Sequence, residues 1–414
     1  MTVAKSAPTP LAAAGDLPAL ADQARAAGQL GIDTEFMSEG RYRALLCLVS
    51  VAVPAVPGPD GPDGVGSEGS KGGQPERAEL IDTLDPEVDP APLAVVLADP
   101  QVEVVVHAGR QDVALLRRVW QTEVTNLFDT QIAAGFAGFG AQTGYGGLLL
   151  DVLGQRVPKS ASFTRWDVRP LTAEQVGYAR DDVVHLLPLA SDLQQRLDAV
   201  GRLEWAREEC RRLEGSSDER DPDLAWQRLP RIGQLSPAAR AVAHELAAWR
   251  ERTAADEDRP VGSVLSDASL VEVAKRRPAT FQALERIRGI QPATLRRRSA
   301  AILDAVRHGM EADPLPLDNG ERIEPNPADA PLIALGEALV RARALDAGLA
   351  YELIAARTDL AQIVAAVRRG RPEPPTRTLQ GWRRNLVGKE LLELLAGKRS
   401  LAIGPGGRMV ITQS

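Results

Sequence analysis

Four apolar, β-branched segments fill much of the first 110 residues, and a helical pattern follows them. The four segments are residues 30–36, 43–53, 78–84 and 102–109. Runs of this length and composition, bounded by polar residues, are typical of strands. Helices are predicted at 17–29 and 92–100, and from Gln111 onward few strand signals occur before residue 214. Strands that come first, with one helix among them, predict an α/β fold with a mixed sheet.

One insertion separates the second and third predicted strands. Residues 57–76 consist of Gly, Pro, Ser and charged residues with almost nothing apolar. Such a segment cannot bury enough surface to compensate for the entropy lost on ordering. We predict a disordered loop there.

The remainder of the chain divides into helical regions. The polar stretch 214–223 marks the end of the first domain, which we place at 1–215, and helical domains are predicted at 231–312 and 328–414. Residues 264–276 and 354–368 align at an offset of 90 residues, which predicts a duplicated helical domain. The alternative, that any two amphipathic helices look alike, stays open.

Bulk composition places the protein among soluble globular proteins. The chain has 414 residues, of which 44% are hydrophobic and 25% charged, and no apolar run reaches the length of a membrane span. Prolines interrupt the N-terminal segment, so no signal peptide is predicted. Two cysteines far apart in sequence, Cys47 and Cys210, fit a reducing cytoplasm and exclude the usual thiolate zinc site.

Charge is unevenly distributed. The net charge of −7 argues against a protein that coats a polyanion. Residues 271–310 nevertheless contain nine Lys or Arg against three Asp or Glu. Positive charge is therefore local, and the acidic residues are expected to gather elsewhere.

Two acids stand one residue apart in the first strand. Asp33 and Glu35, in the sequence GIDTEF, point to the same side of a strand because side chains alternate between its faces. Carboxylates held this close repel unless a proton or a cation lies between them. The alternative interpretation is a strand end that runs into an acidic turn.

Further acids occur at helical positions. Asp112 lies just past a strand end at the start of a helix, where the helix dipole favours a carboxylate. Tyr178 and Asp182 are four residues apart on a helix and share a face, whereas Asp181 is expected to face solvent. Taken singly, these residues have ordinary interpretations as a helix cap and a surface pair.

Taken together, the four carboxylates predict a metal site. Groups from a strand, a helix start and a later helix converge only if they share a cation, and oxygen ligands alone select hard ions such as Mg²⁺ or Mn²⁺. Two such ions can cleave a phosphodiester by in-line displacement. The Tyr178 hydroxyl, one turn before Asp182, could hold the attacking water.

Five blocks of sequence, in order, carry a resemblance to a known family. They are DTEF, HAGRQDVALL, LFDTQIAAGF, KSASFTRWDVRPLT and GYARDDVVHLLPL. They resemble the ribonuclease D family of 3′-5′ exonucleases, in the tyrosine subtype of the DEDD superfamily. The sister subtype would have a histidine where this chain has Gly177.

The resemblance implies a fold, a site and an activity. It implies a ribonuclease-H-like fold in which GIDTEF is the first strand. It implies that Asp33, Glu35, Asp112 and Asp182 hold two divalent metal ions, Mg²⁺ or Mn²⁺, and that Tyr178 orients the nucleophile. The implied reaction is hydrolysis of RNA from its 3′ end, which releases nucleoside 5′-monophosphates, in the maturation of structured RNA such as transfer RNA precursors.

The helical regions resemble the helicase-and-ribonuclease-D C-terminal (HRDC) domain, with a second, divergent copy at the end of the chain. This resemblance implies nucleic-acid binding. Arg296, Arg297 and Arg298 are candidates for phosphate contacts, with a solvated helix face as the alternative.

Smaller predictions concern the substrate. Phe36 and His107 are candidates for contact with the terminal nucleotide, and Lys159 for contact with a phosphate. For His107 the alternative is a satisfied core histidine. Relatives usually carry an acid where this chain has Arg165, which puts a local contact in doubt.

Two other functions compete with an exoribonuclease. A DNA exonuclease of the same superfamily would use the same acids, because they act on phosphate and do not read the sugar. A catalytically silent RNA-binding scaffold would be expected to lack a ligand. RNA is the predicted partner, with no membrane and no obligate protein partner evident, and the predicted location is the cytoplasm.

Overall fold

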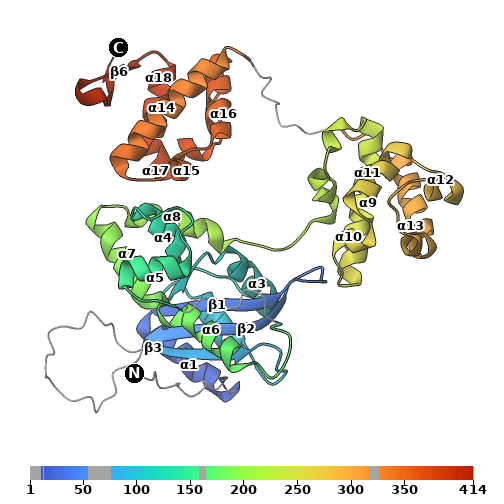
Figure 1. The fold of residues 1–414 in the computed structure, drawn as a ribbon, viewed down its shortest axis with the longest axis horizontal. Helices are drawn as coiled ribbons and strands as arrows, with labels where there is room; N and C mark the ends of the chain where they lie inside the picture. The colour runs from blue at the N-terminus through green and yellow to red at the C-terminus, as the bar shows by residue number, and fades with distance from the viewer. Residues whose placement is uncertain (1–10, 13, 55–75, 158–164, 317–325, 414) are drawn as a thin grey trace.

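The computed structural model describes residues 11–12, 14–54, 76–157, 165–316 and 326–413. An N-terminal α/β region precedes two helical regions, which lie apart from each other in space (Figure 1). Residues 57–75 of the predicted loop lie outside the described residues, and its last residue, Glu76, begins β3. In the part of the chain that is described, every helix is too short or too polar to span a membrane.

The α/β region is built on a five-stranded sheet with the order β3-β2-β1-β4-β5. Its strands are β1 (Gln29–Met37), β2 (Leu45–Pro54), β3 (Glu76–Asp82), β4 (Glu103–Val106) and β5 (Leu127–Asp129). β1 pairs antiparallel with β2 and parallel with β4, β2 pairs antiparallel with β3, and β4 pairs parallel with β5. The predicted mixed sheet is confirmed. β5 was not predicted, because three residues are too few to show a period.

Helices cover both faces of this sheet. On one face α1 (Leu17–Ala27), α2 (Ala91–Leu97) and α3 (Arg110–Trp120) share a core with Leu30 and Ile32 of β1. On the other face lie α4 (Thr130–Phe136), α5 (Tyr145–Leu153), α6 (Ala173–Val184), α7 (Leu186–Ala199) and α8 (Leu203–Glu214).

Gly31 fixes how closely the second layer approaches β1. A Cβ there would lie 3.4 Å from the side chains of both Ala52 and Leu187, so α7 packs tightly on the strand. Residues alternate along a strand, and therefore Asp33 and Glu35 point to the same face as Gly31, toward the layer that contains α6.

The first helical region packs around one long helix. It contains α9 (Pro237–Asp256), α10 (Val261–Val264), α11 (Asp267–Arg276), α12 (Phe281–Glu285) and α13 (Pro292–Glu311). The Ser236 hydroxyl caps α9 by accepting the N–H of Ala239. At Gly309 a Cβ would lie 2.5 Å from Cα of Val242, so α13 crosses α9 at close range.

The second helical region repeats part of this arrangement. It contains α14 (Asp329–Ala347), α15 (Tyr351–Ile354), α16 (Arg357–Arg368), α17 (Gly381–Arg383) and α18 (Lys389–Leu395), and a hairpin of β6 (Arg399–Ile403) and β7 (Met409–Gln413) follows. Helices α10 and α15 begin 90 residues apart, as do α11 and α16. This spacing equals the sequence offset, and the duplication stays a prediction. The hairpin was not predicted.

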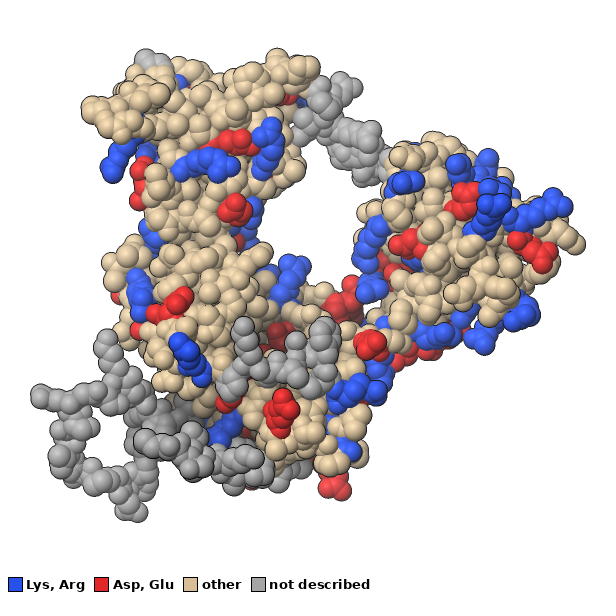
Figure 2. All heavy atoms as spheres, viewed as in Figure 1, with Lys and Arg blue, Asp and Glu red and all other residues tan. Residues whose placement is uncertain are grey.

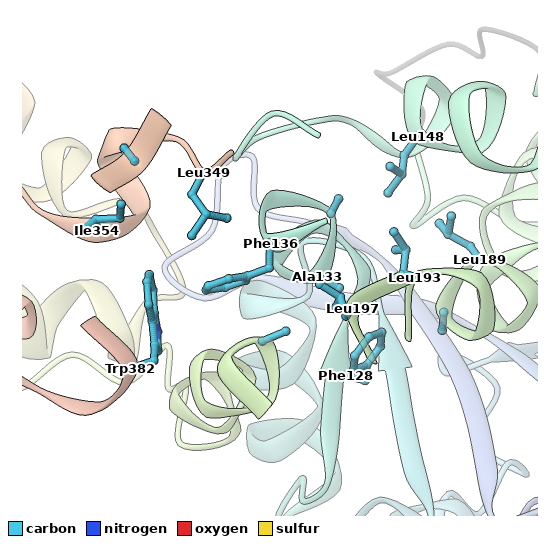
Figure 3. Packing of buried hydrophobic residues seen from close by; sticks show 14 of the residues in the cluster. Phe128, Ala133, Phe136, Leu148, Leu189, Leu193, Leu197, Leu349, Ile354 and Trp382 are labelled. Atoms are coloured by element: carbon cyan, nitrogen blue, oxygen red, sulfur yellow. The ribbon is translucent and has the colours of Figure 1, made fainter. Parts of the chain in front are cut away.

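The second helical region docks on the α/β region through aromatic rings (Figure 3). Trp382 stacks on Trp205 of α8 with ring centroids 5.1 Å apart, and its edge meets Phe136 of α4 at 5.0 Å. Leu349 and Ile354 of the second helical region belong to the same hydrophobic core. This region therefore shares a core with the α/β region.

The first helical region meets the α/β region at the turn between β1 and β2. Arg41 forms an ion pair of 2.6 Å with Asp258, whose carboxylate also accepts the backbone N–H of Tyr42. The Tyr42 ring packs with Ala254 and Val264.

Candidate active site

Three of the four predicted carboxylates converge beside the sheet. Asp33 and Glu35 of β1 and Asp182 of α6 each offer an oxygen, and these atoms all lie within 4.8 Å of one another. No lysine or arginine is paired with any of the three among the described residues. All three are partly buried. The arrangement is an uncompensated acidic cluster.

Helix α6 brings Asp182 and Tyr178 to the cluster. It begins with a capping box, in which the Thr172 hydroxyl accepts the Gln175 N–H at 3.2 Å and the Gln175 side chain accepts the Thr172 N–H at 2.9 Å. The helix then packs across β1, β2 and β3. Tyr178 and Asp182 share its inner face, as their spacing predicted.

Asp112 lies close to the cluster but outside the group of three. Its carboxylate accepts a hydrogen bond from the Thr34 hydroxyl. Its charge still contributes to raising the pKa of both Asp33 and Glu35. Asp112, the fourth predicted ligand, is thus near the other three carboxylates, and its own carboxylate is hydrogen-bonded to Thr34 of β1.

A tight turn sets the position of Asp112. A Cβ at Gly109 would lie 2.5 Å from the side chain of buried Val106, so only glycine lets α3 begin directly after β4. The Asp129 carboxylate accepts the N–H groups of Ala108 and Gly109 at 3.1 and 2.9 Å. Sequence reasoning assigned no role to Asp129, although an aspartate between an apolar strand and a helix is a typical N-cap.

Burial and mutual repulsion raise the pKa values of the cluster. Burial, and then the charge of Asp182, raise the pKa of Glu35 from 4.5 to about 8. Burial, and then the charge of Asp112, raise the pKa of Asp33 well above its usual value. Burial raises the pKa of Asp182 to about 6, against a hydrogen bond from Tyr178 that lowers it. Burial and the charge of Asp182 also raise the pKa of Tyr178.

A cavity of about 830 Å³ opens beside Asp182 and Tyr178. The start of α5 lines it, at Tyr145 and the two glycines that follow, together with one face of α6. Asp181, which was expected to face solvent, is half-buried and lines this open cavity. The described residues of the lining include one basic side chain, Arg156. The cavity is large enough for a nucleotide.

The three residues predicted to contact the substrate, Phe36, His107 and Lys159, have different surroundings. Phe36 packs against the core on the α1–α3 face, away from the face that Asp33 and Glu35 occupy. The His107 Nδ1 lies 2.9 Å from the Thr130 hydroxyl, and its ring lies 5.4 Å from that of Tyr145. Lys159 lies outside the described residues. The nucleotide contacts of these three residues stay predictions.

Arg165, the departure from the family pattern, has a partner close in sequence. Its guanidinium is exposed and forms a two-pronged ion pair with Asp167, with both distances 2.7 Å.

The arginine run on α13 splits by helical position. Arg296 and Arg297 are exposed and free to contact phosphates. Arg298 is buried and donates to Glu257 at 2.7 Å, so its predicted phosphate contact is wrong. The physical reason is the helical period, because Arg298 falls on the same face as buried Leu295 and Ile302. Lys and Arg side chains nevertheless gather over the surface of the first helical region (Figure 2).

The fold and the acidic cluster define a class of nuclease. Residues 13–198 match the family of 3′-5′ exonuclease domains, and residues 239–306 match the HRDC domain.

Comparison over the whole chain gives the family. The chain is 35% identical to ribonuclease D of Gluconacetobacter diazotrophicus, over 94% of this chain and 93% of the relative. It is 33% identical to ribonuclease D of Granulibacter bethesdensis, over 97% and 96%. The crystal structure of Escherichia coli RNase D, an exoribonuclease involved in structured RNA processing, superposes with a TM-score of 0.78 at 26% identity, over 94% of this chain and 99% of that one. The chain belongs to the ribonuclease D family, and the prediction of a 3′-5′ exoribonuclease is confirmed.

The residues of the cluster fit the divalent ions that this family implies. The group of three offers only carboxylate oxygens, the donors that hard divalent cations prefer. Without a cation, three acids within 4.8 Å are held together against their own repulsion, as the raised pKa values show.

Proposed function

We propose that the protein hydrolyses the terminal phosphodiester of RNA with two divalent ions, Mg²⁺ or Mn²⁺, and releases nucleoside 5′-monophosphates. The observation that carries the proposal is the convergence of Asp33, Glu35 and Asp182 within 4.8 Å, with no cation from the described residues beside them. Asp112 is the fourth ligand in this proposal, and it would exchange its hydrogen bond to Thr34 for the ion. Two bound ions supply an activated water and stabilise the charge on the leaving oxygen.

Tyr178 has the second role in the proposal. Its hydroxyl is protonated at neutral pH like any tyrosine, and burial and the neighbouring charge of Asp182 raise its pKa further. A protonated hydroxyl can donate one hydrogen bond and accept another, so it can orient a water molecule without becoming its base. The aromatic ring of Trp166 supports it from behind, at 6.1 Å between centroids.

The substrate in this proposal is the 3′ end of structured RNA, with transfer RNA precursors as the leading candidates. The Escherichia coli relative is an exoribonuclease involved in structured RNA processing. The cavity beside Asp182 would take the terminal nucleotide, with Arg156 next to a phosphate. Exposed Arg296 and Arg297 would contact the backbone of a folded RNA farther from its end.

The test is degradation of matched RNA and DNA oligomers, labelled at the 3′ or the 5′ end, with Mg²⁺, with Mn²⁺ and with chelator. We expect release of mononucleotides from the 3′ end of RNA that depends on the metal. Asp182→Asn should reduce the rate by more than about 1,000-fold, because it removes a ligand of the ions that would balance the negative charge of the transition state. Asp192→Asn, on the outer surface of α7, is the matched control and should keep full activity.

Other outcomes separate the competing functions. Preference for DNA would keep the site and overturn the substrate. Binding of RNA without cleavage in any metal would support the silent scaffold. Full activity of Asp182→Asn would overturn the assignment of the metal ligands.

A further inference from the structure

The segment of residues 165–172, which leads into α6, lies directly behind Tyr178. Trp166 is buried in a small core with Cys47, Leu48 and Leu80 of the sheet, and Tyr178 packs against the same core. Its ring contacts that of Tyr178 at 6.1 Å and 34°. The position of the Trp166 indole therefore limits where the Tyr178 ring can lie.

Arg169 anchors this segment to the sheet with all five of its N–H donors. Its Nε and Nη2 bind both oxygens of Asp82 at 2.5 Å each. The other Nη2 donor reaches the Cys47 carbonyl at 2.8 Å, and Nη1 donates to the carbonyls of Trp166 at 2.7 Å and Val168 at 3.1 Å. One guanidinium thus links β2, β3 and the backbone of Trp166.

The ion pair between Arg169 and Asp82 is largely enclosed. The Arg169 side chain is 26% exposed and that of Asp82 is 16% exposed, so water competes little with their bonds. On the other side, the Gln175 side chain of α6 donates to the Arg165 carbonyl at 3.4 Å. The backbone around Trp166 is therefore held to the sheet by Arg169 and to α6 by Gln175.

We propose that Arg169, clamped by Asp82, is a positioning residue for Tyr178: it holds the Trp166 indole against the tyrosine ring and so keeps the Tyr178 hydroxyl beside Asp182. The inference rests on the proposed role of Tyr178. Lysine cannot replace Arg169, because an ammonium group has three donors on a single atom and cannot span Asp82 and three carbonyls.

The test is a double-mutant cycle between Arg169→Lys and Tyr178→Phe, with kcat and KM measured on a short single-stranded RNA in saturating Mg²⁺. We expect Tyr178→Phe to reduce kcat by about 100-fold, as loss of a group that positions the reacting water does. Arg169→Lys should reduce kcat by about tenfold, with KM changed by less than about twofold, because the misplaced group acts in the chemical step. In the Tyr178→Phe background Arg169→Lys should change kcat by less than about twofold.

Two further variants test whether the effect is specific to the Arg169–Asp82 pair. Asp82→Asn keeps the side-chain shape and removes the charge that orients Arg169, so it should follow Arg169→Lys in the cycle. Arg118→Lys is the matched control, because Arg118 also bridges a carboxylate, that of Asp218, and a carbonyl next to β2, that of Ala44, far from Tyr178. It should leave kcat unchanged in both backgrounds.

The outcomes distinguish the inference from the function on which it rests. If Arg169→Lys and Asp82→Asn lower kcat by the same factor with and without the Tyr178 hydroxyl, the positioning role is overturned and the role of Tyr178 stands. If Tyr178→Phe turns over like the wild type, the proposed role of Tyr178 fails first. A larger effect on KM than on kcat would also overturn the inference.

Discussion

Two partly buried carboxylates of this protein, Glu35 and Glu209, are held in opposite ways. In the acidic cluster the pKa of Glu35 is raised to about 8 and no basic side chain of the described residues is paired with it. On α8, burial would raise the pKa of Glu209 as well, but hydrogen bonds and the charge of Arg383 outweigh burial and lower it. The chain thus supplies a cation for Glu209, and it supplies none from the described residues for Glu35, at the site where we propose that metal ions bind.

The two places also respond to pH with opposite sign. A carboxylate whose pKa is lowered by folding stabilises the protein above its unfolded pKa, and that contribution is lost as the pH falls. A carboxylate whose pKa is raised favours the folded state only while it is protonated, so its contribution is lost as the pH rises. Glu209 follows the first rule and Glu35 the second.

The largest expected effect comes from removal of the cation beside Glu209. Arg383 is 2% exposed and donates to the Glu209 carboxylate at 2.5 and 2.9 Å. Arg383→Ala removes the buried cation that pairs with Glu209 and leaves the Trp382 indole N–H and the more distant, exposed Arg212 beside the carboxylate. We therefore expect a loss of about 3 kcal/mol in the unfolding free energy of the docked second helical region. Urea unfolding at pH 7, followed by tryptophan fluorescence because Trp382 lies in the interface, measures it.

Arg384→Ala is the control for that experiment. Arg384 pairs with exposed Glu373, where solvent screens the pair, so its loss should change the unfolding free energy far less than that of Arg383. Equal losses for the two variants would show that the Arg383 pair does not hold the interface.

The stability of the acidic cluster is tested by adding a cation, whereas that of the Glu209 interface is tested by removing one. At 100 times the dissociation constant, Mg²⁺ or Mn²⁺ should stabilise the wild type by about 2.7 kcal/mol, because the ion binds the folded state alone. Asp182→Asn should lose most of this stabilisation, since it removes one of three converging ligands. Thermal melts across a metal titration measure the effect. Equal metal-induced stabilisation of wild type and Asp182→Asn would place the metal elsewhere.

The sequence predicts the parts of this contrast that depend on residues a few positions apart, and it does not predict those that depend on residues far apart in the chain. The acids of β1 and α6 are visible because strand alternation and the four-residue spacing of a helix fix which side chains share a face. The pairing of Glu209 with Arg383 is invisible, because it joins residues that are 174 apart and depends on how two regions dock.

The same distinction explains the other errors and omissions. β5 has three residues and no period of its own, and it is held by its neighbour β4. The Thr34 hydroxyl that engages Asp112 comes from another element, 78 residues away. Arg298 is the exception, because its helical period alone could have placed it on the buried face.

The pH dependence of the metal-free protein should be smaller than the metal effect and opposite in sign to that of Glu209. The pKa of Glu35 rises from 4.5 to about 8 on folding, so its contribution to stability is lost between these pH values. A shift of one unit corresponds to about 1.36 kcal/mol, and partial hydration reduces the total to roughly 2 kcal/mol. Melts in chelator between pH 5 and 8.5, with Glu35→Gln beside Glu87→Gln on an exposed turn, measure it.

We expect Glu35→Gln to gain stability relative to the wild type as the pH rises, because a neutral amide cannot be deprotonated. Glu87→Gln should follow the wild type. Parallel curves for all three proteins would show that Glu35 is not strained by its neighbours.

The smallest expected effect is at the contact of the first helical region with the β1–β2 turn. The side chains of Arg41 and Asp258 are 37% and 49% exposed, so their coupling should be about 0.2–1 kcal/mol and should weaken in high salt. A double-mutant cycle with Arg41→Ala and Asp258→Ala measures it through the melting of this region. The turn follows Glu35 by a few residues, yet the exposed pair contributes too little to move a buried strand. Turnover of a short RNA should therefore be unchanged, whereas a coupling above about 3 kcal/mol, the range of a buried pair, would mean that this contact resembles the Glu209 interface after all.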